Sequence, residues 1–127
     1  MNNDKTDNIA FSNWDAIDKA LLDATKEGKL EEVEELLSGG AFINVQDENG
    51  WTPLMHSAYA QNVKLTQLLM NNGADTELRG KNGEKAIYLS KTGPAMGVIF
   101  NGLKERYKKR ALAKEQSKQN QSNTSEL

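Results

Sequence analysis

The chain has 127 residues, of which 37% are hydrophobic and 6% aromatic, and this length and composition predict one domain without a large closed core. It contains no cysteine, which excludes a disulfide framework and thiol chemistry. The net charge is only −2, and no apolar run approaches the ~20 residues that cross a bilayer, so we expect no transmembrane segment and a cytoplasmic location.

The first predicted helix pair follows a polar start. Residues 1–8 have no periodic apolar face, and we predict a disordered N-terminal tail. Ser12 or Asn13 could cap a helix near residues 15–26, and a second helix is predicted near residues 30–38 after a break at Gly28. The apolar positions of this pair include Leu21, Leu22, Ala24, Leu30, Val33, Leu36 and Leu37.

Residues 47–79 form the most regular unit of the chain. Gly50 makes a turn, Thr52 can cap a short helix, and Pro53 stands where a missing N–H group costs nothing. A second helix carries its apolar residues on one face, namely Leu65, Leu68, Leu69 and Met70. Gly73 follows this helix, where a left-handed cap is expected. So small a helix pair needs stacked neighbours on both sides.

The third unit departs from this pattern at its end. Its inner helix is predicted near residues 85–91, and Pro94 should stop it because proline cannot continue the hydrogen-bond ladder. A last helix, predicted from about Ala95, should overrun the stack by two turns or more. Its apolar positions are Met96, Ile99, Phe100, Leu103 and Tyr107. Residues 113–127 run from basic to polar and are predicted to form a disordered tail.

Charge is distributed unevenly along the chain. Residues 1–35 hold ten acids and four lysines, a formal charge of −6, whereas residues 104–118 hold seven bases and two acids, +5. The basic segment Lys104–Lys118 could therefore bind nucleic acid or an anionic surface. A solvated helix that keeps the last repeat in solution is the alternative that we favour.

The unit recurs at a fixed spacing, which places Gly40 one period before Gly73 and Gly50 one period before Gly83. With the segment Thr52-Pro53-Leu54, it resembles an ankyrin repeat, whose signature is a turn and two antiparallel helices with Thr-Pro-Leu-His at a period of about 33 residues. The resemblance covers roughly residues 15–107.

The resemblance implies an all-α ankyrin-repeat solenoid with short β-hairpin fingers and an extended C-terminal helix. We expect about three helix-turn-helix repeats, near residues 14–46, 47–79 and 80–112, within a domain of residues 9–112.

The resemblance also implies a non-enzymatic module that binds one protein partner through its concave groove and finger tips, as an adaptor, an inhibitor or an immunity-type protein. Trp51 and Tyr59 fall on binding positions of the family, although either could instead pack on the neighbouring finger. Lys26 holds a corresponding place one repeat earlier. The candidate partner-binding residues are Glu48, Asn49, Trp51, His56, Tyr59, Lys81 and Glu84.

His56 is the only histidine. The frequent histidine of the family stands one position earlier, where this chain has Met55, so His56 is expected to be a partly exposed residue that faces the groove. A catalytic base needs a partner group and a metal needs several ligands. We therefore expect no catalytic residue, no metal site and no cofactor, and we expect a monomer.

Overall fold

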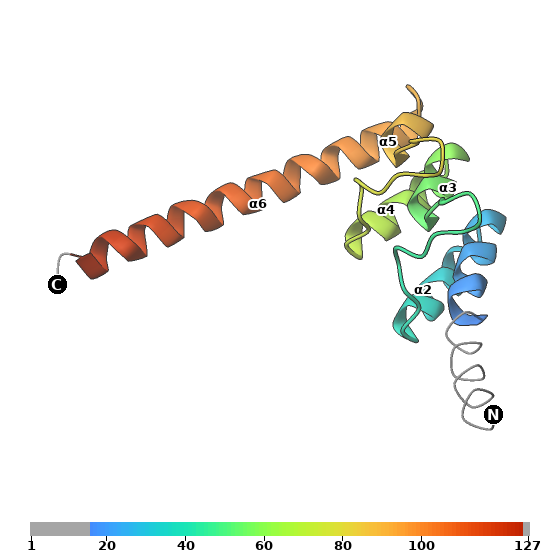
Figure 1. The fold of residues 1–127 in the computed structure, drawn as a ribbon, viewed down its shortest axis with the longest axis horizontal. Coiled ribbons are helices and arrows are strands. Elements are labelled where there is room, and N and C mark those ends of the chain that lie inside the picture. The colour runs from blue at the N-terminus through green and yellow to red at the C-terminus, as the bar shows by residue number, and fades with distance from the viewer. Residues whose placement is uncertain (1–15, 126–127) are drawn as a thin grey trace.

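A computed structural model describes residues 16–125, and their side chains as far as residue 117. The predicted tail of residues 1–8 and the predicted caps Ser12 and Asn13 lie outside the described residues. A first helix spans residues 16–27 of the described part. The helices that follow it are α2 (Leu30–Ser38), α3 (Pro53–Tyr59), α4 (Val63–Asn71), α5 (Ala86–Leu89) and α6 (Pro94–Ser125) (Figure 1).

The helices are arranged in antiparallel pairs that stand next to one another (Figure 1). The short helices α3 and α5 pack together in one row, and α4 packs against both α2 and α6 in the other. Each pair contributes to one apolar core, whose largest fully buried side chains include Leu21, Val33, Leu54, Leu65, Leu69 and Ile99. The prediction of an all-helical fold is confirmed for the described residues.

The middle pair owes its sharp boundaries to local signals. The Thr52 hydroxyl accepts a hydrogen bond from the backbone N–H of Met55 at 3.2 Å, as predicted. Asn62 caps α4 in the same way, through the N–H of Leu65 at 3.2 Å. Each such cap contributes about 1 kcal/mol to helix stability.

Glycine backbone angles confirm the register of the repeats. Gly40 and Gly73 have φ of +99° and +82°, and Gly50 and Gly83 have φ of +75° and +82°. Both members of each pair adopt the left-handed conformation that glycine reaches without strain. The same turn is therefore formed at the same place in successive repeats.

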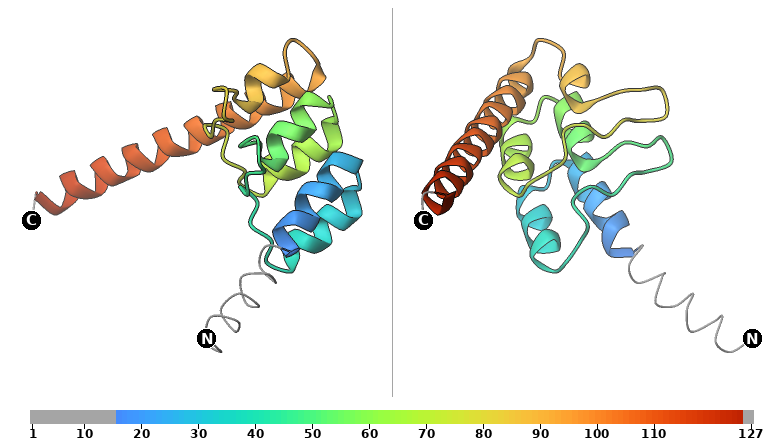
Figure 2. Two further views of the ribbon diagram at one scale, coloured as in Figure 1. Left: turned by 45° about the vertical axis from the view of Figure 1, so that its right-hand side comes forward. Right: turned by 60° about the vertical axis from the view of Figure 1, so that its left-hand side comes forward.

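The fingers, residues 42–51 and 75–84, project side by side from the helices (Figure 2). Between residues 16 and 125 no β-strand is formed, so the prediction of β-hairpin fingers was wrong. The tip of the first finger closes through two backbone bonds, from the N–H of Asp47 to the carbonyl of Trp51 at 2.9 Å and from the N–H of Gly50 to the carbonyl of Asp47 at 2.8 Å. The Asp47 carboxylate accepts the N–H group of Asn49 in the turn and that of Trp51, which a strand ladder would have used.

The third pair begins with a very short helix. Instead of residues 85–91, α5 covers Ala86–Leu89, and no side chain caps it at Lys85. The chain turns at Lys91, where φ is +52°. Contrary to the prediction, Pro94 does not stop α5; it begins α6, because a proline in the first helical turn loses no hydrogen bond.

The last helix leaves the body of the protein and extends far beyond it (Figure 1). It continues to Ser125, whereas a disordered tail had been predicted from residue 113. Residues 103–118 contain neither glycine nor proline and are rich in Lys, Arg, Ala and Glu, which all favour helix. The boundaries of the repeat domain remain predictions. Within residues 16–125, no helix has both the length and the apolar character that spanning a membrane requires.

Candidate functional site

An aromatic cluster lies where the first finger meets α3. The ring centroid of Trp51 is 5.1 Å from that of His56 and 5.4 Å from that of Tyr59, the latter in an edge-on arrangement. Trp51 is half-buried, whereas Tyr59 is 60% exposed. Three predicted site residues are thus brought together, and Tyr59 is the one that presents most of its surface to solvent.

Asp47 holds this cluster in place, although it was not among the site residues predicted from the sequence. One carboxylate oxygen lies 2.8 Å from Nε2 of His56, and the other accepts the N–H groups of Asn49 and Trp51, both at 2.9 Å. Its side chain is only 13% exposed, and that of His56 16%. His56 is therefore only partly exposed. An aspartate just before the Gly50 turn was the available signal, because such carboxylates commonly accept N–H groups two residues on.

The environment shifts both ionisation equilibria. Burial lowers the pKa of His56 and outweighs the hydrogen bond to Asp47, which acts to raise it. For Asp47, burial acts to raise the pKa, but the hydrogen bonds from the Trp51 N–H, His56 and the Asn49 N–H together lower it. The pair therefore favours a neutral imidazole beside a carboxylate, an arrangement that orients side chains without needing a buried cation.

Hydrogen bonds also join the two fingers. The indole N–H of Trp51 donates to Glu84 at 2.9 Å, and this bond contributes most to lowering the pKa of Glu84. The backbone N–H of Lys81 donates to the carbonyl of Asn49, also at 2.9 Å. Trp51 thus packs on the neighbouring finger, which was the alternative to a role as an exposed anchor.

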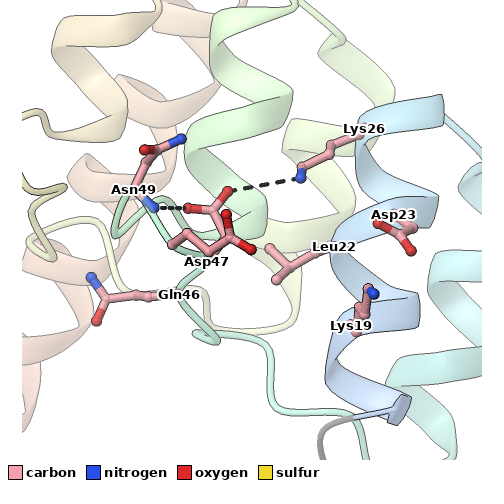
Figure 3. A pocket seen from close by; sticks show the side chains of 8 residues that line it. Lys19, Leu22, Asp23, Lys26, Gln46, Asp47 and Asn49 are labelled. Carbon is pink, nitrogen blue, oxygen red and sulfur yellow. Dashed lines mark hydrogen bonds and ion pairs between the residues drawn. The ribbon is translucent and has the colours of Figure 1, made fainter.

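A hollow of about 500 Å³ opens beside this cluster, between the first helix and the first finger. Figure 3 shows Lys26 reaching from the helix toward Asp47, and Nζ lies 3.9 Å from the carboxylate. The lining residues are Lys19, Leu22, Asp23, Lys26, Gln46, Asp47, Glu48 and Asn49. Charges of both signs and an open mouth suit a polar segment of another protein better than an apolar small molecule.

The structure does not gather all predicted site residues. Glu48 lines the hollow, but no hydrogen bond joins its side chain to the aromatic cluster. The side chain of Lys81 is exposed at the tip of the second finger. The described residues include no group of three or more His, Cys, Asp or Glu side chains placed to hold a metal ion.

The basic segment of α6 is engaged at one point with the body of the protein. Arg106 donates to the carbonyls of Ala74 at 2.8 Å and Met70 at 3.1 Å, at the C-terminal end of α4. Cations are favourable at such an end because the last helical carbonyls have no partner in the helix. Arg106 is therefore bound to the fold, while the bases from Lys108 to Lys114 are exposed.

Stacked helix pairs that repeat in a constant register define a class of repeat protein, and comparison with known families identifies it. A family model described as "Ankyrin repeats (3 copies)" matches residues 20–93. This match covers more than half of the chain, so the chain belongs to the ankyrin repeat family. An ankyrin repeat domain is a non-catalytic fold that generally mediates protein–protein interaction.

Individual relatives are large proteins. The chain is 38% identical over 71 residues to the 2-5A-dependent ribonuclease of Homo sapiens, which is 55% of this chain and 10% of that protein. It is 37% identical over 81 residues to the mitochondrial disaggregase of Homo sapiens, 64% of this chain and 11% of that protein. Ankyrin repeat and SAM domain-containing protein 6 of Rattus norvegicus is 41% identical over 70 residues, 54% and 8% respectively. The chain thus spans about a tenth of the length of these relatives.

Proposed function

We propose that this protein is a non-enzymatic binding module that takes one protein partner against its concave groove and finger tips. In this role it would act as an adaptor, an inhibitor or an immunity-type protein, as a monomer in the cytoplasm, within an ankyrin solenoid. The proposed contact residues are Glu48, Asn49, Trp51, His56, Tyr59, Lys81 and Glu84.

The observation that carries the proposal is the support beneath Tyr59. Its ring is 60% exposed and leans edge-on against Trp51, which is itself fixed by hydrogen bonds to Glu84 and Asp47. A rigid, exposed aromatic side chain loses little conformational entropy on binding, and such residues are frequent anchors of protein interfaces. We therefore assign Tyr59 as the anchor, and Trp51 and His56 as its support.

Capture from nuclease-treated host lysate tests this assignment. The intact chain and Tyr59→Ala are immobilised side by side, with Leu112→Ala as the matched control, because Leu112 is 52% exposed on the projecting part of α6. We expect a protein that is held by the intact chain and by Leu112→Ala but lost by Tyr59→Ala. Trp51→Ala is unsuitable, since it would also remove a bond between the fingers.

The second candidate function is binding of nucleic acid or an anionic surface through Lys104–Lys118. The exposed bases of α6 favour it, but Arg106 is already bound to carbonyls of α4. Binding of this kind should weaken steeply as salt rises. Capture that requires nucleic acid, and is equal for Tyr59→Ala and the intact chain, would replace the groove with this basic segment.

A further inference from the structure

One position of the repeat is buried in the first two repeats and exposed in the last. Leu22 is 7% exposed, and Met55, at the equivalent position of the next repeat, is 1% exposed. Tyr88, one repeat further on, is 59% exposed. The first two are each followed by another helix pair, and in the described structure Tyr88 is not. Tyr88 thus lies on a face that a following repeat would cover.

The outer helix repeats this relationship. On α4, Gln67 and Met70 line the space toward α6, together with Gly102. The equivalent positions of the last repeat are Phe100, on the exposed side of α6, and Leu103, which is partly buried and packs against the core. Phe100 is 52% exposed and replaces a polar glutamine at this position. The face therefore carries more apolar surface than its equivalent in the middle repeat.

This side of α6 runs past the start of the second finger, where Thr76 lines a hollow together with Leu103 and Tyr107. Phe100, Leu103 and Tyr107 follow one another at spacings of three and four residues, which places them in one line along the helix. The neighbouring line, which includes Ile99 and Arg106, is bound to the rest of the protein. We define the end face as Tyr88, Phe100, Leu103 and Tyr107.

The end face is bordered by charges of both signs, among which the bases outnumber the acids. Nζ of Lys104 lies 5.1 Å from the ring centroid of Phe100, and Nζ of Lys85, which is paired with Glu77 at 3.0 Å, lies 6.0 Å from that of Tyr88. Asp75 and Glu77 line a hollow together with Leu103 and Tyr107. Further along α6, Lys108, Arg110 and Lys114 are exposed. Glu105 lines the hollow toward α4 and therefore does not face this side.

We propose that the end face binds an amphipathic acidic helix of a protein partner, in the place that the outer helix of a fourth repeat would take. The apolar line along α6 matches the seam of two packed helices, and the bases beside it select Glu or Asp at the flanks of the partner. This surface is separate from the groove around Tyr59 and requires no part of the proposed function.

Peptide binding tests the proposal directly. The probe is a synthetic helical peptide of about three heptads, with Leu at positions a and d and Glu at e and g, and its counterpart carries Lys for Glu. Isothermal titration should show the Glu peptide binding at least ~10-fold more tightly than the Lys peptide, a difference of about 1.4 kcal/mol. NMR shifts should concentrate on residues 96–114.

Three variants test which side chains bind the peptide. Phe100→Ser/Tyr107→Ser should lower affinity for the Glu peptide at least ~10-fold, whereas Tyr59→Ser should leave it unchanged. The side chains of Phe100, Tyr107 and Tyr59 are all more than half exposed, so circular dichroism should show an intact fold in both variants. Lys104→Glu/Lys108→Glu should reverse the preference between the two peptides.

Several results would overturn the proposal. These are equal binding of the two peptides, an unchanged affinity in Phe100→Ser/Tyr107→Ser, or shifts centred on α3. Self-association of the intact chain that Phe100→Ser/Tyr107→Ser abolishes would assign the face to a second copy instead. Binding of an oligonucleotide without binding of the Glu peptide would assign it to nucleic acid.

Discussion

The middle and last repeats share a register but reach their structures by different means. In the middle repeat, Thr52 and Asn62 cap both helices locally, and the seven-residue helix α3 is buried along most of its length. In the last repeat α5 has four residues, no side-chain cap and one buried residue, Ala86. Local signals in the sequence therefore define the helix boundaries of the middle repeat, whereas the short α5 depends on contacts from the neighbouring repeat.

Two side chains provide these contacts. Gln61 donates to the carbonyl of Ser90 at 2.6 Å and accepts from the N–H of Ala95 at 3.1 Å, so it joins the α3–α4 connection to both ends of the loop before α6. Arg106 reaches back from α6 to the end of α4. The last repeat is therefore stabilised by its contacts with the middle repeat, as expected of an array in which each repeat contacts only its neighbours.

Truncation of the middle core should have the largest effect. Leu69 is fully buried in the middle repeat, so Leu69→Ala should lower the free energy of unfolding by about 2–5 kcal/mol. Urea denaturation should show one transition at a lower midpoint. Leu103→Ala, which shortens a partly buried leucine of the last repeat, should cost clearly less. Equal costs would mean that the two repeats contribute alike.

Loss of the α6 anchor should come next. Arg106→Ala removes two charged hydrogen bonds to carbonyls of the middle repeat and should cost about 1–3 kcal/mol. Arg110→Ala is the matched control, because Arg110 is exposed, and should stay within about 0.5 kcal/mol of the wild type. Denaturation curves for Arg106→Ala and Arg110→Ala that coincide would contradict the anchoring of α6 through Arg106.

Gln61 tests the dependence of the last repeat on its neighbour, because it has a strained backbone conformation and also bonds to Ser90 and Ala95. Its φ is +57°, a conformation that costs roughly 1 kcal/mol for a residue other than glycine. Gln61→Ala should destabilise by about 1–2 kcal/mol through its two lost bonds, and Gln61→Gly by about 1 kcal/mol less.

Hydrogen exchange should locate the Gln61 effect. Amides of α5 should lose protection in both variants, while those of α4 change little, because the lost bonds connect only to the last repeat. Faster exchange spread evenly over α3, α4 and α5 would show that Gln61 supports the whole stack rather than its end.

The smallest effect should be the pH dependence set by His56. Its pKa is lowered in the folded state, so below about pH 6.5 the unfolded chain binds more protons and stability falls with falling pH. The slope cannot exceed about 1.4 kcal/mol per pH unit for one group. His56→Gln should flatten this decline between about pH 7 and 5.

Asp47 contributes in a lower pH range. Its pKa is also lowered, so its stabilising contribution is present above the unfolded value of about 3.9 and is lost as the pH falls through the folded value. Thermal melts of His56→Gln should therefore retain a decline at acidic pH. A decline near pH 6 that is identical in the wild type and His56→Gln would remove His56 as its cause.

Much of the fold followed from the sequence, because its strongest signals are local. Thr52, Pro53 and the glycines at the spacing of one repeat fixed the middle unit, and α2 was predicted with its observed bounds. The length of α5 could not be predicted, since contacts through Gln61 stabilise a segment without its own cap. The fingers were expected to form β-hairpins, but in the first finger the Asp47 side chain accepts the N–H group of Trp51.

The candidate site was predictable only in part. Trp51, His56 and Tyr59 were recognised from their positions in the repeat, and the structure brings their rings together. Asp47 was missed because its role depends on the distance to His56, nine residues away in sequence and on another element. The hydrogen bonds of Arg106 to Ala74 and Met70 could not be predicted for the same reason, because Arg106 lies in a basic segment of the sequence and its acceptors lie on another element.

The bond from Trp51 to Glu84 gives the array a direction. It joins equivalent positions of adjacent repeats, with the donor in one and the acceptor in the next. After insertion of a duplicate of residues 47–79, the second tryptophan would keep the bond to Glu84, whereas the first would face a tryptophan instead of a carboxylate. Duplication of the middle unit therefore leaves one indole N–H without this acceptor, and exchange of the second and third units removes the bond.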